Sequence, residues 1–587
     1  MRATAVLVAV AAIALVLLPW FASQRVFGDL IAEEFTRLTG ARVILGEPPH
    51  FSLFPTFSVK LRNVRFEDGD AVLDAAAIDA DLDIHQALTG TVRFRRLVLD
   101  TPSLVMTRPA SPVRLPFSAG RIGRTIHAAL AGNAAETPPG ETGFGTVAIS
   151  GGRIVMRQDG HDDLAISGID GDIVWPAFER TLKARATGQW QTLPLSVSAD
   201  IERPLLFVAG KPGPARMAVD LEDSRLTFDG EAAWVSGPVA SGRIAIKTGS
   251  FGALLGRFGF GSHLSSRMDD LSFSAAATTS GTRMKFEDAD ISVDGQNGTG
   301  AFDLDFGTPR PAVSGTVAFK DVDLTSFAPA LAAPSVRVAA NMPAASNSGF
   351  GPVDVDLRLS ADVARLGPLP LRHVAASMRI QPELAAFDIS DAETLGGSIQ
   401  AGIHALRGDG PATELQFSAS EIDMGVLVER LGLSAFRPSG PGSFSIILKG
   451  PSTDWAGMLE QASGNLSARF GPGSLGGITR ADLVRQLSDG GPLRRSPDEA
   501  AALKVDGLDI RAPVTAGLVL FEKADFASEA GALSLSGIMS LRDFGLALTG
   551  RLAEAGEPEP ARLFFVGGTL DAPVLSPIGT TSANPGP

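Results

Sequence analysis

Apolar and polar residues alternate along most of this chain, and this period of two limits its fold more than any other feature. One clear run holds Val353, Val355, Leu357 and Leu359, with Asp354, Asp356 and Arg358 between them. A second run holds Phe444, Ile446 and Leu448. Successive side chains of a strand point to opposite faces, so strict alternation predicts strands with one apolar and one wet face. The chain is therefore predicted to be mainly antiparallel β.

Clusters of Gly, Asp and Asn separate the alternating runs and predict hairpin turns. Two examples are the segments 67–70, Glu-Asp-Gly-Asp, and 294–298, Asp-Gly-Gln-Asn-Gly. Such residues tolerate the positive φ that tight hairpins require. We predict an elongated, curled antiparallel β-sheet with a few short helices. Its arrangement is either an open trough or a sandwich, because both need one apolar face on every strand.

The segment 3–22 contains no charged residue and reads ATAVLVAVAAIALVLLPWFA. As a helix, its twenty residues would span about 30 Å, which matches the hydrocarbon core of a bilayer. A cleaved signal peptide is the alternative, but cleavage just after this segment would place Trp20 or Phe21 where a small residue is needed. We therefore predict a single uncleaved transmembrane helix in an anchor at 1–24, with the rest of the chain exported.

Helical spacing occurs only in short stretches after this segment. The apolar residues of 29–38 lie three or four positions apart, as on one face of a helix. Further short helices are predicted at 250–259, 323–328 and 423–432. These three segments resemble one another, either as a weak internal repeat or by chance in a chain rich in Ala, Leu and Gly.

Two proline-rich stretches without periodicity, 109–145 and 328–352, predict linkers between β segments. The helix at 29–38 belongs to the first β region. The predicted organisation is an anchor at 1–24, β regions at 25–108, 146–327 and 353–575, linkers at 109–145 and 328–352, and a disordered tail at 576–587.

Composition excludes several kinds of chemistry. The net charge of −14 disfavours nucleic acid as a partner, because such binding depends on Lys and Arg neutralising phosphates. The chain has no cysteine, so disulfides, thiol catalysis and Cys-ligated metal centres are excluded. Its seven histidines are widely spaced and form no His-Glu-x-x-His motif, and the common serine-nucleophile motifs are missing. We predict no enzyme activity, no catalytic residue, no metal and no cofactor.

One glycine motif has two interpretations. Residues 471–476, Gly-Pro-Gly-Ser-Leu-Gly, match the Gly-x-Gly-x-x-Gly pattern of dinucleotide-binding loops and precede a predicted helix at 479–487. However, the strand before them alternates like an antiparallel strand, and no series of βαβ units follows. We therefore favour a strand-to-helix corner, in which Gly473 and Gly476 supply positive φ or close packing.

Five segments in order resemble the AsmA family of bacterial envelope proteins. They are 39–43 (TGARV), 51–64 (FSLFPTFSVKLRNV), 97–104 (LVLDTPSL), 464–478 (the glycine-rich turn before a helix) and 565–573 (FVGGTLDAP). The resemblance runs from end to end, although each motif is loose. It departs from the family pattern in the proline-rich region and in the compact middle section.

This resemblance implies a single-pass inner-membrane protein, with most of its chain in the periplasm, that acts in outer-membrane biogenesis. It also implies kinship with bridge-like lipid transfer proteins, whose long sheet curls into an apolar trough. The expected function is handling or transfer of lipid along an apolar groove formed by Val353, Val355, Leu357, Leu359, Phe444, Ile446 and Leu448. The expected partners are the inner membrane through 3–22, acyl chains of phospholipid or lipopolysaccharide, and outer-membrane assembly proteins. The alternatives are a scaffold for outer-membrane protein assembly that carries no lipid and, less favoured, an envelope hydrolase.

Overall fold

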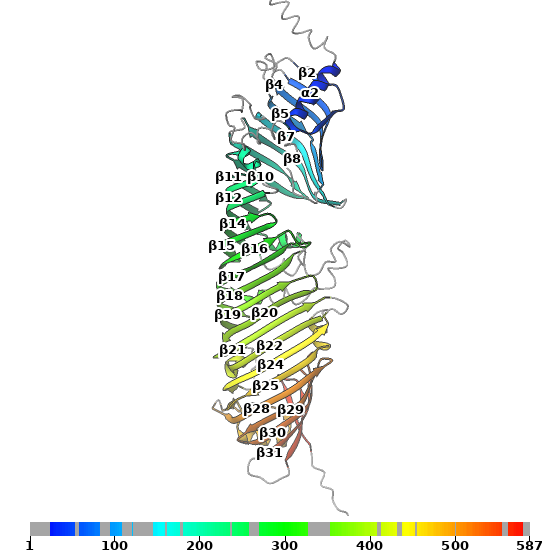
Figure 1. Cartoon of the computed structure of the whole chain (residues 1–587). Coiled ribbons are helices and arrows are strands. Elements are labelled where there is room, and N and C mark those ends of the chain that lie inside the picture. The colour runs from blue at the N-terminus through cyan, green and yellow to red at the C-terminus, as the bar shows by residue number, and fades with distance from the viewer. Residues whose placement is uncertain are drawn as a thin grey trace, which may run out of the picture. The chain divides into compact units, whose positions relative to one another are not determined.

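The computed structural model describes residues 24–52, 58–82, 94–107, 120, 145–158, 161–176, 180–234, 238–257, 269–326, 353–407, 412–430, 437–451, 455–498, 500–554 and 561–578. The chain forms two compact units. Unit one comprises Met1–Gly249 with Ser272–Glu287, and unit two comprises Ser250–Leu271 with Asp288–Pro587. Strands dominate the described residues of both units (Figure 1), which confirms the mainly β prediction.

The described residues of unit one form the first thirteen strands and two helices. The helices are α2 (Gln24–Thr39) and α5 (Pro204–Val208). The strands are β1 (Arg42–Leu45), β2 (His50–Ser52), β3 (Ser58–Asp68), β4 (Ala71–Leu82), β5 (Phe94–Asp100), β6 (Ser103–Thr107), β7 (Gly145–Gln158), β8 (His161–Trp175), β9 (Leu182–Trp190), β10 (Leu193–Ile201), β11 (Gly213–Leu221), β12 (Ser224–Trp234) and β13 (Pro238–Thr248). The division between the units falls within β14 (Leu271–Ser280) and β15 (Arg283–Val293).

Unit two contains the later strands, and Figure 1 shows β16 to β22, β24 and β25 following one another in chain order. The strands are β16 (Gln296–Asp305), β17 (Ala312–Asp323), β18 (Asp354–Leu366), β19 (Leu369–Ile380), β20 (Leu384–Thr394), β21 (Gly397–Leu406), β22 (Ala412–Asp423), β23 (Arg437–Ser439), β24 (Pro441–Pro451), β25 (Ser463–Phe470), β26 (Gly473–Gly476), β27 (Gly491–Pro492), β28 (Ala502–Thr515), β29 (Leu518–Ser528), β30 (Gly531–Ser540), β31 (Leu546–Glu554), β32 (Arg562–Gly568) and β33 (Pro573–Pro577). Its helices are α6 (Phe251–Arg257), the 3-10 turn η1 (Leu324–Ser326), α9 (Met424–Arg430), α10 (Trp455–Glu460) and α11 (Arg480–Asp489).

Most neighbouring strands are antiparallel and joined by tight hairpins. Asp294 and Gly295 connect β15 to β16 with φ of 48° and 80°, the positive values of a two-residue hairpin turn. Parallel pairs occur where β7 meets β5 and β6, and where β18 meets β17. Parallel neighbours need a long crossover connection. The stretches 109–145 and 328–352 supply these connections, so each joins adjacent strands of one unit, and the units divide elsewhere.

The pairing register places apolar residues in continuous rows that cross many strands, because directly paired residues share a face of the sheet. One row of unit two consists of Val317, Leu359, Ala376, Ile389, Ala401, Phe417, Ile446, Leu466 and Ala512. A corresponding row of unit one consists of Val59, Ala80, Leu97, Val147, Ile173, Ala184, Ala199, Met217, Phe228 and Ile244. The alternation in the sequence therefore produces one continuous apolar face within each unit.

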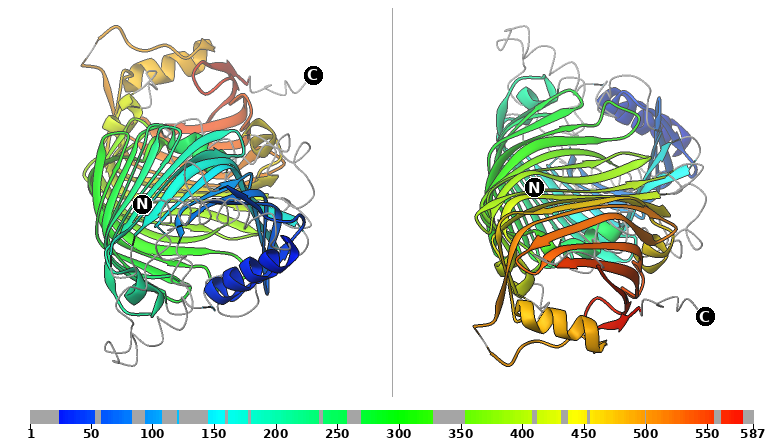
Figure 2. Two further views of the ribbon diagram at one scale, coloured as in Figure 1. Left: turned by 90° about the horizontal axis from the view of Figure 1, so that it is seen from above. Right: turned by 90° about the horizontal axis from the view of Figure 1, so that it is seen from below.

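Bulges interrupt the ladders of unit two at recurring points. The pairing shifts register between Arg372 and Ala375 in β19, beside the pair Arg372–His373, and at the pairs Ser420–Glu421 in β22 and Glu522–Lys523 in β29. In each pair, both residues are exposed, so two consecutive polar residues face away from the apolar side. A bulge bends its strand and increases the local twist. Accordingly, the strands of unit two are arcs rather than straight ribbons (Figure 2).

The predicted helices are confirmed where the structure describes them. The helix at 29–38 is part of α2, and those at 250–259 and 423–432 correspond to α6 and α9. The helix predicted at 323–328 differs, because the described part of this segment forms only the 3-10 turn η1. No described helix is long and apolar enough to cross a bilayer. The predicted anchor helix at 3–22 lies outside the described residues. The first two residues of the predicted disordered tail, 576 and 577, instead end β33, and residues 579–587 of that prediction lie outside the described residues.

Candidate functional site: the apolar face of unit two

The structure brings the predicted groove residues onto one face of the unit two sheet. Val355, Leu357 and Leu359 lie on β18, and Val353 precedes that strand. Phe444, Ile446 and Leu448 lie on β24. Leu359 and Ile446 belong to the cross-strand row described above. The neighbouring row is Leu357, Met378, Phe387, Ile403, Leu415 and Leu448. That these residues line an open groove stays a prediction.

Residues from intervening strands complete this face. The Phe417 ring of β22 stacks on the Phe444 ring of β24, with centroids 5.5 Å apart and an interplanar angle of 24°. Leu415 on β22 and Leu466 on β25 extend the same surface. These residues were not predicted, although Leu415 and Phe417 alternate with Glu414 and Gln416 as the predicted residues do with their neighbours.

The larger side chains of the apolar face differ in depth. Leu357, Leu359, Phe444 and Ile446 are half-buried and keep part of their surface in contact with solvent. Ile389, in the row of Leu359, is fully buried by its neighbours. Deep and accessible apolar positions therefore coexist on this face, and a ligand could reach the accessible ones without unfolding the sheet.

The main hydrophobic cluster of unit two is built from strands that follow one another along the chain. Its described members come from β15 to β24, from the short connections between these strands and from α9. The core of a sandwich instead draws side chains from two facing sheets. Among the described residues, this cluster contains no contribution from a second, facing sheet.

Helices pack against the apolar face in both units, and in unit two α9 and α10 contribute Leu427 and Met458 to its buried clusters. In unit one, Phe35 and Leu38 of α2 are buried against β3, and the Phe35 and Phe66 rings meet edge to face at 5.9 Å. In unit two, Leu487 of α11 is buried against residues of β31, β32 and β33. The sequence predicts both helices, but their apolar spacing does not say which strands they cover.

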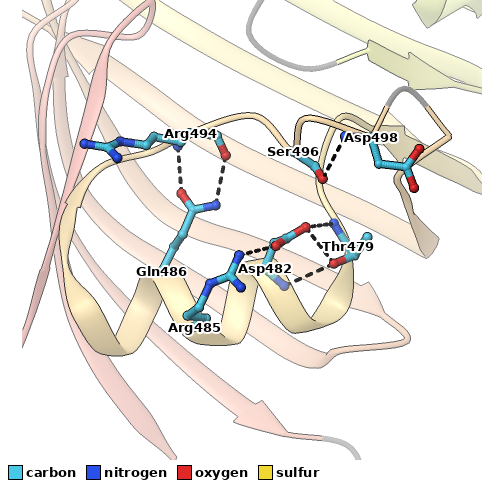
Figure 3. Close-up of polar contacts among 7 residues, drawn as sticks. All are labelled: Thr479, Asp482, Arg485, Gln486, Arg494, Ser496 and Asp498. Atoms are coloured by element: carbon cyan, nitrogen blue, oxygen red, sulfur yellow. Dashed lines mark hydrogen bonds and ion pairs between the residues drawn. The ribbon is translucent and has the colours of Figure 1, made fainter.

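A capping box starts α11 at Thr479 (Figure 3). The Thr479 hydroxyl accepts a hydrogen bond from the Asp482 backbone N–H at 3.1 Å, and the hydroxyl donates to Asp482 Oδ2 at 2.7 Å. The hydrogen bond from the Thr479 hydroxyl, together with one from the Thr479 backbone N–H and the nearby Arg485 guanidinium, lowers the pKa of Asp482. The sequence signature is Thr-x-x-Asp, a variant of the usual capping box.

The glycine motif at 471–476 forms part of a strand corner. Gly473 and Gly476 bound β26, which pairs with β23 and β28. A Cβ at Gly473 would lie 2.0 Å from the Ser439 carbonyl oxygen, so close packing requires this glycine. Positive φ occurs instead at Gly477, at 92°. The predicted corner is confirmed, whereas the expectation of positive φ applies to the following residue.

Two histidines of the described surface each lie beside one carboxylate. His404 Nε2 lies 2.7 Å from Asp388 Oδ1, and His373 Nδ1 lies 3.1 Å from Glu393 Oε2. The described residues contain no group of three or more potential metal ligands. Comparisons with family models, curated proteins and solved structures found no match. The apolar face is therefore the feature from which a function can be argued.

Proposed function

We propose that the protein binds lipid acyl chains on the apolar face of unit two and shields them from water while the lipid is handled or moved. The observation that carries this proposal is the continuous row from Val317 to Ala512, with half-buried Leu359, Phe417 and Ile446 along it. Burying apolar surface is the main driving force for such binding.

The row is long enough for a bound acyl chain to move along it. Neighbouring strands lie about 4.8 Å apart, so the row of nine residues covers roughly 40 Å. One acyl chain in a bilayer covers about 15 Å, half of the hydrocarbon core. The row is thus more than twice as long as one chain, and an acyl chain could pass from one set of contacts to the next.

The resemblance to the AsmA family supports the cellular setting of this proposal. We propose that 3–22 anchors the protein in the inner membrane and that both units lie in the periplasm. The lipid would then be a phospholipid or lipopolysaccharide, and the process would be outer-membrane biogenesis. A scaffold for outer-membrane protein assembly without lipid carriage is the alternative outcome of the experiment below.

Photo-crosslinking tests the proposal directly. The purified protein is incubated with vesicles that contain a phospholipid carrying a diazirine in one acyl chain, irradiated and digested. Mass spectrometry should place adducts on the apolar-face residues of β18, β22 and β24. The matched control is the opposite face of β18, where Asp356 and Arg358 should carry none. Absence of adducts, or equal labelling of both faces, would refute lipid binding at this site.

A further inference from the structure

The apolar face of unit two continues beyond its accessible part. One row proceeds through Phe444, Ala468, Ile510, Ala524, Leu535, Gly550 and Phe564, from β24 to β32. On the last strands of this row, the side chains of the apolar face are buried. Leu552 on β31 is 0% exposed and Phe564 on β32 is 2% exposed. The apolar face thus continues onto the last strands, but there it is buried.

The helix α11 conceals this part of the face. Its residues Leu483, Val484 and Leu487 pack against the cluster formed by Leu548, Leu552, Phe564, Val566 and Leu575. The apolar side of α11 therefore occupies the space that an acyl chain would occupy if it continued along the row. The other side of α11 carries polar contacts, including the capping box (Figure 3).

The attachments of α11 allow it to move as one piece. Gly477 precedes the helix, and Gly490 and Gly491 follow it, with φ of 92°, 72° and 98°. Glycine is the residue that adopts such values most readily and crosses between backbone regions with least hindrance. The Gln486 side chain accepts a hydrogen bond from Arg494 N at 2.7 Å and donates one to Arg494 O at 2.8 Å, so part of the following loop is held to the helix. The two residues of β27, Gly491 and Pro492, tie the same loop to β33.

Polar contact between α11 and the sheet lies at the rim of the buried apolar contact. The Arg562 guanidinium of β32 donates a hydrogen bond to Ser488 Oγ at 2.7 Å. Both partners are exposed, so water can replace this bond when the helix lifts. Lifting the helix then requires separation of the two-residue β27–β33 pairing and exposure of apolar surface, and an acyl chain entering beneath the helix would cover that apolar surface again.

We infer that α11 is a displaceable cover over a second acyl-chain site, formed by the apolar face of β30 to β33. With the cover seated, the acyl-binding surface ends before β31. With the cover lifted, it continues to β33. This inference rests on the proposed function, because the ligand that replaces α11 is the acyl chain of the same lipid.

The absence of cysteine from the chain permits a clean test. Pro492 and Val574 are directly paired between β27 and β33, and both are exposed. Directly paired Cα atoms lie within the range that a disulfide spans. The variant P492C/V574C should therefore tie the end of the cover to the sheet when oxidised and release it when reduced. The matched control is R185C/S198C, a paired exposed position between β9 and β10.

Diazirine phospholipid vesicles report on both parts of the face in one experiment. The reduced P492C/V574C protein should give adducts on β22 and β24 and also on Leu548 and Phe564. Oxidation should reduce the adducts on β31 and β32 at least tenfold and leave those on β22 and β24 unchanged. Oxidation of the control variant should change neither. In a second variant, Leu483→Ser with Leu487→Ser should increase the labelling of β31 and β32.

The outcomes separate the two ideas. Adducts on β22 and β24 with no response of β31 and β32 to oxidation would overturn the cover and leave the proposed function standing. Absence of adducts on every strand would overturn both. The oxidised and reduced forms are the same polypeptide, so the comparison does not depend on the serine variant folding well.

Discussion

Replacing both Val355 and Leu357 by Asp would show whether the apolar face is accessible or dry. Both side chains are half-buried. Full burial of a Val or Leu side chain contributes about 1.5–3 kcal/mol, so losing about half of that at each position costs about 1.5–3 kcal/mol in total. A typical domain stability of about 5–15 kcal/mol tolerates this loss. The double variant should therefore fold, because its carboxylates can remain hydrated.

A dry core would respond differently. Each aspartate would then be desolvated without a partner, at a cost of several kcal/mol per charge, and the unit would unfold. Ile389 provides the matched buried position, since it lies in the row of Leu359 and is 2% exposed. Ile389→Asp should cost about 4 kcal/mol or more.

Urea unfolding and acyl photo-crosslinking of the same preparations give the comparison. The double Asp variant should unfold with a midpoint near that of the original protein and lose acyl adducts on β18. A second control, Asp356→Asn with Arg358→Gln, changes the opposite face of β18 and should keep both properties. If the double variant were destabilised as strongly as Ile389→Asp, the reasoning would be wrong and the face would be a sandwich core.

Two further predictions concern the last strands and α11. Ile538 is 39% exposed, and Leu548 on the adjacent strand is 5% exposed. Ile538→Lys should therefore change the urea midpoint little, whereas Leu548→Lys should cost about 2–4 kcal/mol of stability. Similar losses of stability in the two variants would refute the placement of these residues on opposite faces. The pKa of Asp482 is lowered in the folded state, chiefly by its hydrogen bond with Thr479. The ionised form of Asp482 therefore stabilises α11 at pH values above the unfolded pKa near 4. This stabilisation is lost as the pH falls through the folded pKa. Thr479→Ala should cost about 1 kcal/mol at pH 7 and weaken this acid sensitivity; unchanged stability between pH 3 and 6 in both proteins would contradict it.

The strands and their apolar faces could be predicted because the alternation of apolar and polar residues is visible within each short segment of the sequence. The alternation around Leu357 and around Ile446 indicates which face of each strand is apolar. The pairing register then places the apolar faces of neighbouring strands on the same side of the sheet. The Asp-Gly pair at 294–295 reports the hairpin for the same reason, since few residues adopt its backbone angles. The division into two units had no such signal. It falls within β14 and β15, which alternate like their neighbours.

The coverage of the apolar face could not be predicted from local patterns. The spacing of Leu483 and Leu487 predicts a helix with one apolar side, but any apolar strand surface would satisfy it. The choice of β31 to β33 depends on contacts between residues more than sixty positions apart. The predicted glycine corner shows the same limit, because the need for Gly473 arises from the Ser439 carbonyl oxygen of another strand.

Alternation leaves trough and sandwich undecided because it records that a face is apolar and not what lies against it. The register places the described strands of unit two side by side in one sheet. A sandwich would bring distant strands to face one another, whereas the cluster around Leu359 is drawn from consecutive strands and α9. The bulges beside Arg372–His373 and at Ser420–Glu421 and Glu522–Lys523 bend these strands. In a single bent sheet, some apolar side chains can be buried by the side chains beside them, while others remain accessible to solvent. Lipid binding at the accessible positions would then need no separation of layers, and movement of α11 would be needed only for binding at the covered positions of β30 to β33.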